Sequence, residues 1–319
     1  MHRFVIAALT GVLLAGSAMT GAASAATIGV SMAQFNDNFL TVLRNGIIEY
    51  AKTKPDVTLQ VEDGGNDVNK QLSEVQNFIA SKVDAIIVNP VDTDSTAAIS
   101  KLAADAKIPL VYVNRQPANM DTLPANQAFV GSNESDSGTL ETKQICKLLK
   151  DAGKSSGANV YVMEGQLNNQ AAVQRTQDVK DVIATSDCSF IKIIDLQTAN
   201  WQRDQSQSLM ANWLTAGTPY DAVISNNDEM ALGALQAMKA AGVDTSKVII
   251  GGVDATQEAL ASMKAGDLKV TVFQDAAGQG KGALDTALAL AKGDKVDRAV
   301  WVPFQLVTPE NIANYMSKN

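Results

Sequence analysis

The chain has 319 residues, with 26 basic and 34 acidic side chains and a formal net charge of −8. An acidic chain without a basic cluster argues against nucleic acid and against an anionic membrane surface as partners. The only histidine is His2, which excludes Ser-His-Asp and Cys-His catalysis, and histidine metal sites, from the rest of the chain. The composition therefore favours binding over catalysis, and we expect no metal ion.

Residues 1–25 have the pattern of a secretory signal peptide. Arg3 precedes an apolar run, and Ala23-Ser24-Ala25 follows as a small-residue cleavage site. We expect cleavage after Ala25, and removing 25 of the 319 residues leaves an exported chain of 294. A retained membrane anchor is the alternative, but the apolar stretch is short and is interrupted by Gly and Ser. A mature chain of this length predicts two domains.

The first half of the mature chain alternates short β-branched runs with longer segments of helical spacing. We expect strands at 27–32, 57–62, 84–89, 108–113 and 127–131. We expect helices between them, for example at 69–82 and 94–107. This alternation indicates βαβ units and a parallel sheet. The strands are apolar on both faces, as expected when helices cover both sides of the sheet.

The same alternation restarts in the second half of the chain. We expect strands there at 158–163, 189–195, 220–225, 247–253 and 268–273. The predicted fold class is therefore α/β, with two doubly wound parallel-sheet domains. No proline-rich or low-complexity linker separates them, so the passage near 131–133 should be a short crossover rather than a flexible tether.

Nearly every predicted strand ends in Asn, Asp, Gln, Arg or an aromatic residue. Parallel doubly wound sheets bind ligands outside the carboxyl ends of their strands, so these residues should face a common crevice. The stretch "QFNDNFL" (34–40) shows the pattern, because a connecting loop does not need Phe35 and Phe39. Aromatic faces and planar polar groups suit sugars and polyols. The candidate binding residues are Asp37, Phe39, Asn114, Arg115, Arg175, Trp201, Asn227, Asp254 and Gln274.

These candidates have structural alternatives. Asp37 and Asn227 could be helix N-caps, the usual role of Asp and Asn at strand-to-helix junctions. Arg115 and Arg175 could be surface charges paired with nearby acids. Phe39 could be core packing, whereas Trp201 lies in a polar loop, where core packing is less expected.

No cofactor is expected. The segment "AGQGKGA" (277–283) fits the loose dinucleotide-binding pattern, but no strand ending in an acid follows it. The Gly-Lys-Ser of "DAGKSSG" (151–157) lacks the first glycine of a phosphate-binding loop. Cys146 and Cys188 could form a disulfide in an oxidising compartment or could be two separate buried thiols, and their spacing leaves both readings open.

Several motifs together resemble the type I periplasmic sugar-binding proteins of bacterial ABC importers, the ribose/galactose-binding group. The resemblance covers essentially the whole mature chain. The motifs are "VNRQP" (113–117), "QRTQD" (174–178), "SNNDEMALGALQAMKAAG" (225–242), "GGVDATQEALASMKAGDLKVTVFQD" (251–275) and "VTPENIANY" (307–315).

The resemblance implies two lobes joined by a hinge, with three crossings near 131–134, 274–277 and 302–305. The lobes would comprise residues 26–132 plus 276–302, and residues 133–275 plus 303–319. It implies that Phe39 and Trp201 stack on the ligand and that the other seven candidates bind its polar groups. It also implies a periplasmic monomer that delivers a small neutral or weakly charged sugar or cyclitol to a membrane permease. Delivery to a chemoreceptor is a further role that the sequence leaves open.

Three departures from the ribose-binding pattern bear on the ligand. Asn114 replaces the customary Asp, Asp37 stands where ribose binders commonly have Asn, and Leu40 replaces a second Phe. The stretches "FNDNFLT" and "EGQLNNQAAVQRTQDV" are more similar to inositol-binding and rhizopine-binding members. We therefore predict a cyclitol, either myo-inositol or an amino-inositol such as a rhizopine, whose ammonium group could pair with Asp37 or Asp254.

Three other interpretations compete with this one. The ligand could be a pentose or hexose, such as ribose or galactose. A sugar-responsive transcription regulator would need a DNA-reading module where this chain has a signal peptide. A periplasmic enzyme acting on a polyol would have to use Asp37 and Asp254 as its acid–base pair.

Overall fold

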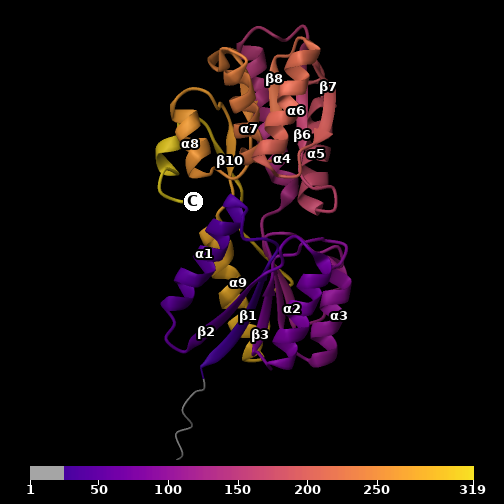
Figure 1. The fold of residues 1–319 in the computed structure, drawn as a ribbon, viewed down its shortest axis with the longest axis vertical. Coiled ribbons are helices and arrows are strands. Elements are labelled where there is room, and N and C mark those ends of the chain that lie inside the picture. The colour runs from indigo at the N-terminus through magenta and orange to yellow at the C-terminus, as the bar shows by residue number, and fades with distance from the viewer. Residues whose placement is uncertain (1–24) are drawn as a thin grey trace, which may run out of the picture.

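The computed structural model describes residues 25–319. The signal-peptide prediction falls almost entirely on residues 1–24, outside the described part of the chain. Figure 1 shows two α/β lobes stacked along the long axis and joined by a few connecting segments. Within residues 25–319, no helix is both long enough and apolar enough to cross a membrane.

The first lobe is built on a six-stranded parallel sheet in the order β11-β5-β4-β3-β1-β2. The strands are β1 (Ala26–Met32), β2 (Val57–Asp63), β3 (Ala85–Val88), β4 (Leu110–Val113), β5 (Gln127–Gly131) and β11 (Ala299–Trp301). The helices are α1 (Asn38–Lys52), α2 (Val68–Ala80), α3 (Thr96–Ala106) and α9 (Ala276–Ala291), with a short 3₁₀ helix, η1 (Met120–Thr122).

Consecutive residues of the central strands point to opposite faces of this sheet and so enter two separate cores. Ile87 belongs to the core formed with α1 and α9. Its neighbour Ile86 belongs to the core formed with α2 and α3. Both side chains are fully buried, which explains why the central strands read as continuous apolar runs.

The second lobe repeats this plan with a four-stranded parallel sheet in the order β7-β6-β8-β9. The strands are β6 (Ala158–Glu164), β7 (Ile191–Thr198), β8 (Ala222–Ser225) and β9 (Ile249–Gly251). The helices are α4 (Glu134–Asp151), α5 (Gln170–Ile183), α6 (Arg203–Ala216), α7 (Asp228–Ala240) and α8 (Gln257–Lys264), with 3₁₀ helices η2 (Thr245–Lys247) and η3 (Ile312–Asn314).

Three details of the sheets differ from the sequence prediction. β11 and β12 were not among the predicted strands, and β11 is the sixth strand of the first sheet. The strand expected at 268–273 forms only the short β10 (Thr271–Phe273), which pairs with β12 (Gln305–Val307) in an antiparallel ladder and reaches β9 only through isolated bridges. The expectation of strands buried on both faces is wrong for β2, whose residues alternate between partly buried and exposed. β2 lies at the edge of its sheet, and strand order is not visible in local sequence.

The chain passes between the lobes three times (Figure 1). β5 lies in the first sheet, and the helix that follows it, α4, packs in the second lobe against α5. β10 lies beside β9, and α9 after it packs on α1 and on β3, β4 and β5. β11 pairs with β5, and β12 after it returns to β10. Each passage takes two or three residues, so the carboxyl ends of both sheets are held facing each other.

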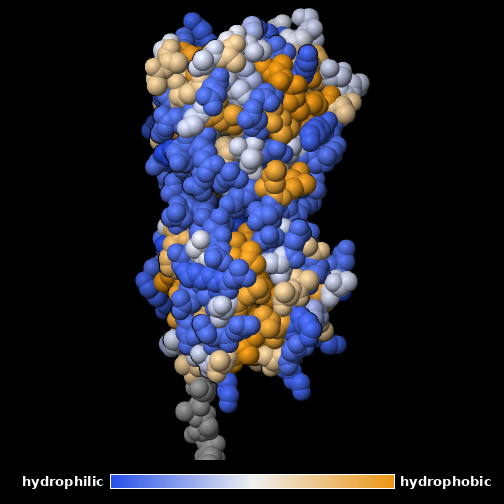
Figure 2. Space-filling model, turned by 45° about the vertical axis from the view of Figure 1, so that its right-hand side comes forward, coloured by the Kyte–Doolittle hydropathy of each residue, from blue (hydrophilic) through white to orange (hydrophobic). Residues whose placement is uncertain are grey.

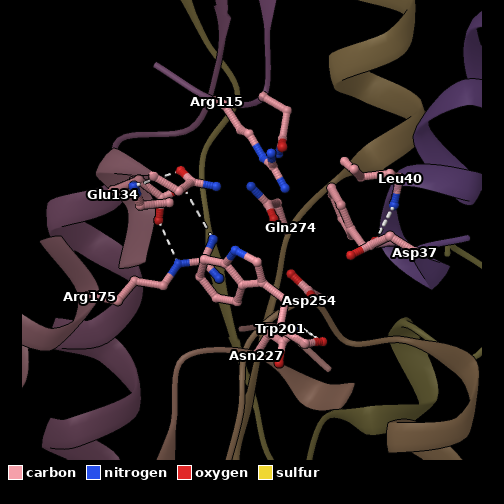
Figure 3. Close-up of a pocket in the computed structure, with 13 residues that line it drawn as sticks. Asp37, Leu40, Arg115, Glu134, Arg175, Trp201, Asn227, Asp254 and Gln274 are labelled. Atoms are coloured by element: carbon pink, nitrogen blue, oxygen red, sulfur yellow. Dashed lines mark hydrogen bonds and ion pairs between the residues drawn. The ribbon is translucent and has the colours of Figure 1, made fainter. Parts of the chain in front are cut away.

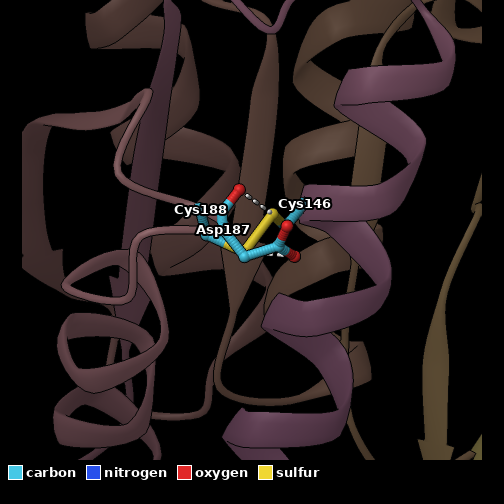
Figure 4. A group of neighbouring side chains, drawn as sticks. All are labelled: Cys146, Asp187 and Cys188. Carbon is cyan, nitrogen blue, oxygen red and sulfur yellow. Dashed lines mark hydrogen bonds between the residues drawn. A yellow bond between two sulfur atoms is a disulfide. The ribbon is translucent and has the colours of Figure 1, made fainter.

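Cys146 and Cys188 form a disulfide, with their Cα atoms 5.8 Å apart (Figure 4). The bond ties α4 to the turn before β7 across 42 residues of chain. The reading of two separate thiols is therefore wrong. Asp187 lies beside the two sulfurs, but bonded sulfurs offer no thiolate to a metal ion.

Removal of this disulfide should destabilise the second lobe without altering its fold. Closing a loop of this length restricts the unfolded chain, and we expect the Cys146→Ala/Cys188→Ala variant to lose about 2–4 kcal/mol of unfolding free energy. Urea denaturation followed by circular dichroism measures this loss. Wild-type protein treated with a reductant should match the variant, and equal midpoints for oxidised wild type and the variant would contradict the expectation.

Candidate ligand-binding site

All nine predicted site residues line one cavity between the two lobes (Figure 3). They come from the carboxyl ends of strands in both sheets and from the segments that follow them. Four further residues line the same cavity: Leu40, Glu134, Asn169 and Ala171. The expectation that the carboxyl ends of parallel strands meet at one crevice therefore agrees with where these nine residues lie.

Asp37 and Asn227 are helix N-caps as well as cavity residues. A carboxylate oxygen of Asp37 accepts a hydrogen bond from the backbone N–H of Leu40 at 2.8 Å. Oδ1 of Asn227 accepts one from the N–H of Met230 at 3.0 Å. The cap fixes each side chain at the first turn of its helix, at the cavity wall. Nδ2 of Asn227 also donates to the carbonyl oxygen of Trp201 at 3.5 Å. The two readings of these residues are therefore compatible.

Arg175 is buried in an ion pair with Glu134 at the second-lobe wall of the cavity (Figure 3). Its Nε donates to Glu134 Oε2 at 2.7 Å, and its Nη2 donates to Oε1 at 3.1 Å. Its Nη1 donates to the carbonyl oxygen of Asn226 at 2.7 Å. Burial alone would lower the pKa of Arg175, but the adjacent Glu134 carboxylate outweighs it and raises that pKa. The alternative of a surface charge is wrong for Arg175.

Arg115 is also buried and lies across the cavity in the first lobe. Its Nη1 donates to the carbonyl oxygens of Pro90 at 2.9 Å and Val91 at 3.3 Å. Within residues 25–319 its other guanidinium N–H groups have no acceptor, so they are available to a ligand. Burial lowers the pKa of Arg115 to about 10, which leaves it charged at neutral pH. The surface-charge alternative fails here as well.

Asn114 is held in a buried polar network of the first lobe. Its Oδ1 accepts from Nδ2 of Asn89 at 3.3 Å, and its Nδ2 donates to Oε1 of Gln279 at 3.1 Å. Its φ of +67° lies in the left-handed region, which Asn tolerates better than most residues. Nδ2 of Asn114 donates no second hydrogen bond within the part of the chain that the structure describes, so one amide hydrogen is available at the cavity.

Both predicted stacking residues belong to the hydrophobic cores and to the cavity wall at once. Phe39 packs with α1 and α9, and Trp201 packs in the core that α6, α7 and α8 share. The expectation that Trp201 avoids the core is therefore wrong. The indole lies over Gly165, where an added Cβ would come within 2.1 Å of the ring. The missing Cβ at this glycine is therefore what allows the indole to come this close to the backbone after β6.

Two buried donors at the cavity have no acceptor within residues 25–319: Nε1 of Trp201 and Nε2 of Gln274. Both side chains are almost fully buried. A buried donor without an acceptor is costly, so such groups mark places where a bound molecule supplies the missing acceptor. Ring hydroxyl oxygens have that chemistry.

Asp254 carries the most strongly perturbed carboxyl group of the cavity. Burial raises its pKa well above the ordinary value, and the guanidinium of Arg175 only partly offsets this. Burial also raises the pKa of Asp37, against the hydrogen bond from Leu40. These two carboxyl groups stand on opposite lobes, so a ligand that contacts both bridges the cavity.

Sequence reasoning missed Glu134 because its position resembles an ordinary one. It opens α4 directly after the cap Asn133, and an acid in the first turn of a helix usually needs no further explanation. Asn169 was missed for a similar reason, since it caps α5 through the N–H of Ala171 at 3.1 Å. Its place in the strand end "EGQLNNQ" was the available signal.

The chain matches the periplasmic binding protein domain over residues 28–295 and belongs to that family. Over 319 residues, the full length of both chains, it is 59% identical to a protein of Rhizobium meliloti named "Putative rhizopine-binding protein". An ABC transporter solute-binding protein of Bacillus halodurans with bound myo-inositol is similar at TM-score 0.86 and 40% identity, covering 94% of this chain and 100% of that one. A Caulobacter myo-inositol binding protein with bound myo-inositol gives TM-score 0.83 and 30% identity, covering 93% and 97%.

Members of this family bind small sugars or cyclitols, work with the permease of an ABC importer and are exported to the periplasm. The predicted fold class and the predicted family are confirmed. The relatives described above are binding proteins rather than enzymes.

The contact of Gly165 with Trp201 makes a first testable prediction for the site. Gly165→Ala should cost about 1–3 kcal/mol of unfolding free energy, because the new methyl group overlaps the indole. In a Trp201→Ala background the same change should cost much less, which a double-mutant cycle by thermal denaturation measures. An equal cost in both backgrounds would show that the glycine does not position the indole.

Two further buried acids lie behind the site. Oε1 of Glu141 accepts from the N–H of Ser225 at 3.2 Å, and burial raises the pKa of Glu141 to about 8. Asp228 accepts from the N–H of Thr256 at 2.8 Å and from the hydroxyl of Thr271 at 2.7 Å. Burial raises the pKa of Asp228 to about 7. Both carboxyl groups therefore keep their proton to a higher pH in the folded chain than in the unfolded chain.

This burial predicts a pH dependence of stability. Between an unfolded pKa of 4.5 and a folded pKa of about 8, the folded chain holds a proton on Glu141 that the unfolded chain has lost. The free energy of unfolding should therefore fall as pH rises through that window. Glu141→Gln should flatten the dependence and raise the melting temperature at pH 8.5 by about 2–4 °C, equivalent to about 1 kcal/mol. A melting temperature of Glu141→Gln at pH 8.5 that is no higher than that of wild type would contradict this interpretation.

Proposed function

We propose that this chain is the periplasmic solute-binding component of an ABC importer and that it binds a cyclitol, either myo-inositol or an amino-inositol such as a rhizopine. The observation that carries this proposal is the single cavity in which both lobes present hydroxyl-binding groups and two aromatic faces. The names and bound ligands of the relatives support the cyclitol. The protein works as a monomer and does not alter its ligand.

We propose that all nine predicted residues contact the ligand. Phe39 and Trp201 provide the apolar faces, while the other seven side chains bind ring substituents. The ligand closes the lobes because it bonds to both of them and therefore favours the closed form by its differential affinity. The moving bodies are residues 26–132 plus 276–302, and residues 133–275 plus 303–319, with the three passages as the hinge.

The charges of the cavity favour an amino-inositol over myo-inositol. Three carboxyl groups, those of Asp37, Glu134 and Asp254, face the guanidinium groups of Arg115 and Arg175. Arg175 is already paired with Glu134. The remaining set has two carboxyl groups and one guanidinium group, so the cavity has a second carboxyl group that an ammonium group on the ligand could pair with in its ionised form. An ammonium ion beside Asp254 also lowers the pKa that burial has raised.

Calorimetry with four ligands tests this proposal: an amino-inositol, myo-inositol, ribose and galactose. We expect the amino-inositol to bind about tenfold or more tightly than myo-inositol, because a charge-assisted hydrogen bond contributes about 1.5–3 kcal/mol. An ammonium group beside Asp254 lowers the pKa of this carboxyl group, so binding of the amino-inositol should release protons in the pH range between the free and bound pKa values. Calorimetry in several buffers across that range detects the release as a dependence of the heat on the buffer, and myo-inositol should show none.

The controls separate the parts of the proposal. Asp254→Asn should remove both the proton release and most of the preference for the amino-inositol. Binding of ribose or galactose without binding of either cyclitol would show that the cyclitol assignment is wrong. Chemical conversion of any of the four ligands by the purified protein would show that it is an enzyme.

A further inference from the structure

Two sets of hydrogen bonds join the lobes outside the cavity. The first, here called the first clasp, joins Asn38 at the start of α1 to Glu229 on α7. The second clasp joins Thr93, in the segment between β3 and α3, to residues 168–170 before and at the start of α5. The face shown in Figure 2 is largely hydrophilic where the lobes meet, as polar contacts of this kind require.

The first clasp has an acceptor that its own lobe has already fixed. Glu229 receives two hydrogen bonds from Arg203, Nε to Oε2 at 2.9 Å and Nη2 to Oε1 at 2.7 Å. Arg203 is held in turn by Glu258 at 2.6 Å. Nδ2 of Asn38 then donates to Oε1 of Glu229 at 2.7 Å. Because Glu229 is immobilised beforehand, the bond between the lobes orders only the Asn38 side chain.

The second clasp is formed largely by backbone groups. The N–H of Thr93 donates to the carbonyl oxygen of Asn168 at 3.1 Å, and its hydroxyl lies 3.2 Å from the same oxygen. The N–H of Gln170 donates to the Thr93 hydroxyl at 3.2 Å. Thr93 is fixed in its own lobe, where its carbonyl oxygen accepts from the hydroxyl of Thr96 at 2.6 Å.

In each clasp, one lobe contributes direct sequence neighbours of residues that line the cavity. Asn38 stands between Asp37 and Phe39, and both of those line the cavity. Asn168 and Gln170 stand on either side of the cavity residue Asn169. The cavity residues therefore cannot reach a ligand shared by the two lobes without bringing the clasps together. Closure on the ligand and closure of the clasps are one movement.

We propose that the two clasps determine how tightly and for how long the ligand is held, although none of their bonds is made to the ligand. They stabilise the closed form by an amount that does not depend on ligand chemistry. The observed binding constant depends on two quantities: the affinity of the ligand for the cavity residues, and the equilibrium constant between the open and closed forms of the lobes. The clasps act on the second. This inference rests on the hinge closure proposed above and extends it to residues outside the cavity.

Asn38→Ala and Thr93→Val each remove side-chain hydrogen bonds of one clasp and leave the cavity residues in place. Each variant should raise the dissociation constant for the best-binding cyclitol about 3- to 10-fold, the ratio expected for one net hydrogen bond. The change should lie mainly in the dissociation rate, measured by stopped-flow tryptophan fluorescence. The double variant should show about the product of the two effects.

Asn36→Ala is the matched control. Asn36 lies two residues before Asn38, is exposed, and makes no side-chain hydrogen bond within residues 25–319. It should bind the ligand within twofold of wild type. Clasp variants that also stay within twofold of wild type, or a control that weakens binding as much as they do, would overturn the inference.

A separate readout covers the case in which wild type binds none of the four ligands. That result would reject the proposed function. The effect of the clasps on lobe closure would then be measured on ligand-free protein. Small-angle X-ray scattering of ligand-free protein should then give a larger radius of gyration for the double variant than for wild type and Asn36→Ala. Identical scattering curves for all three proteins would also overturn the inference that the clasps stabilise the closed form.

Discussion

The site depends on one buried ion pair, that of Arg175 with Glu134. Two charges removed from water are tolerated only when their geometry is good and their remaining donors are satisfied. Here the pair is bidentate, and the third guanidinium nitrogen donates to the carbonyl oxygen of Asn226. Glu134 opens the helix that follows the first passage between the lobes, so the pair also ties that passage to the second-lobe wall of the cavity.

The pair decides what the rest of the cavity can bind. With Glu134 paired to Arg175, the carboxyl groups of Asp37 and Asp254 line the cavity from opposite lobes without an ion-pair partner within residues 25–319. Arg115 is the counter-charge nearest to Asp37, and part of its guanidinium is already bonded to backbone carbonyls. A cavity of this kind favours polar rings rich in hydrogen-bond donors. A ligand ammonium group would pair with one of the two carboxylates, whereas a neutral sugar would leave that carboxylate without a positive partner.

Much of the fold and most of the site could be predicted from the sequence, because both follow from short-range rules. Strand and helix periodicity locate elements, and the carboxyl ends of parallel strands meet at one edge. Asp37, Asn227 and Asp254 were found this way. What the rules miss is contact between distant segments. Glu134 becomes a site residue only because α4 packs on α5, and the disulfide exists only because the turn at Cys188 meets α4.

The most direct measurement is a crystal structure with an amino-inositol or myo-inositol bound. The account predicts one ring in the cavity, with oxygens of Asp37 and Asp254 each within about 3.2 Å of a ligand polar atom, and with Arg175 still paired to Glu134. A ring held by one lobe alone, or bound outside the cavity, would contradict it. So would an Arg175 that leaves Glu134 to take the ligand.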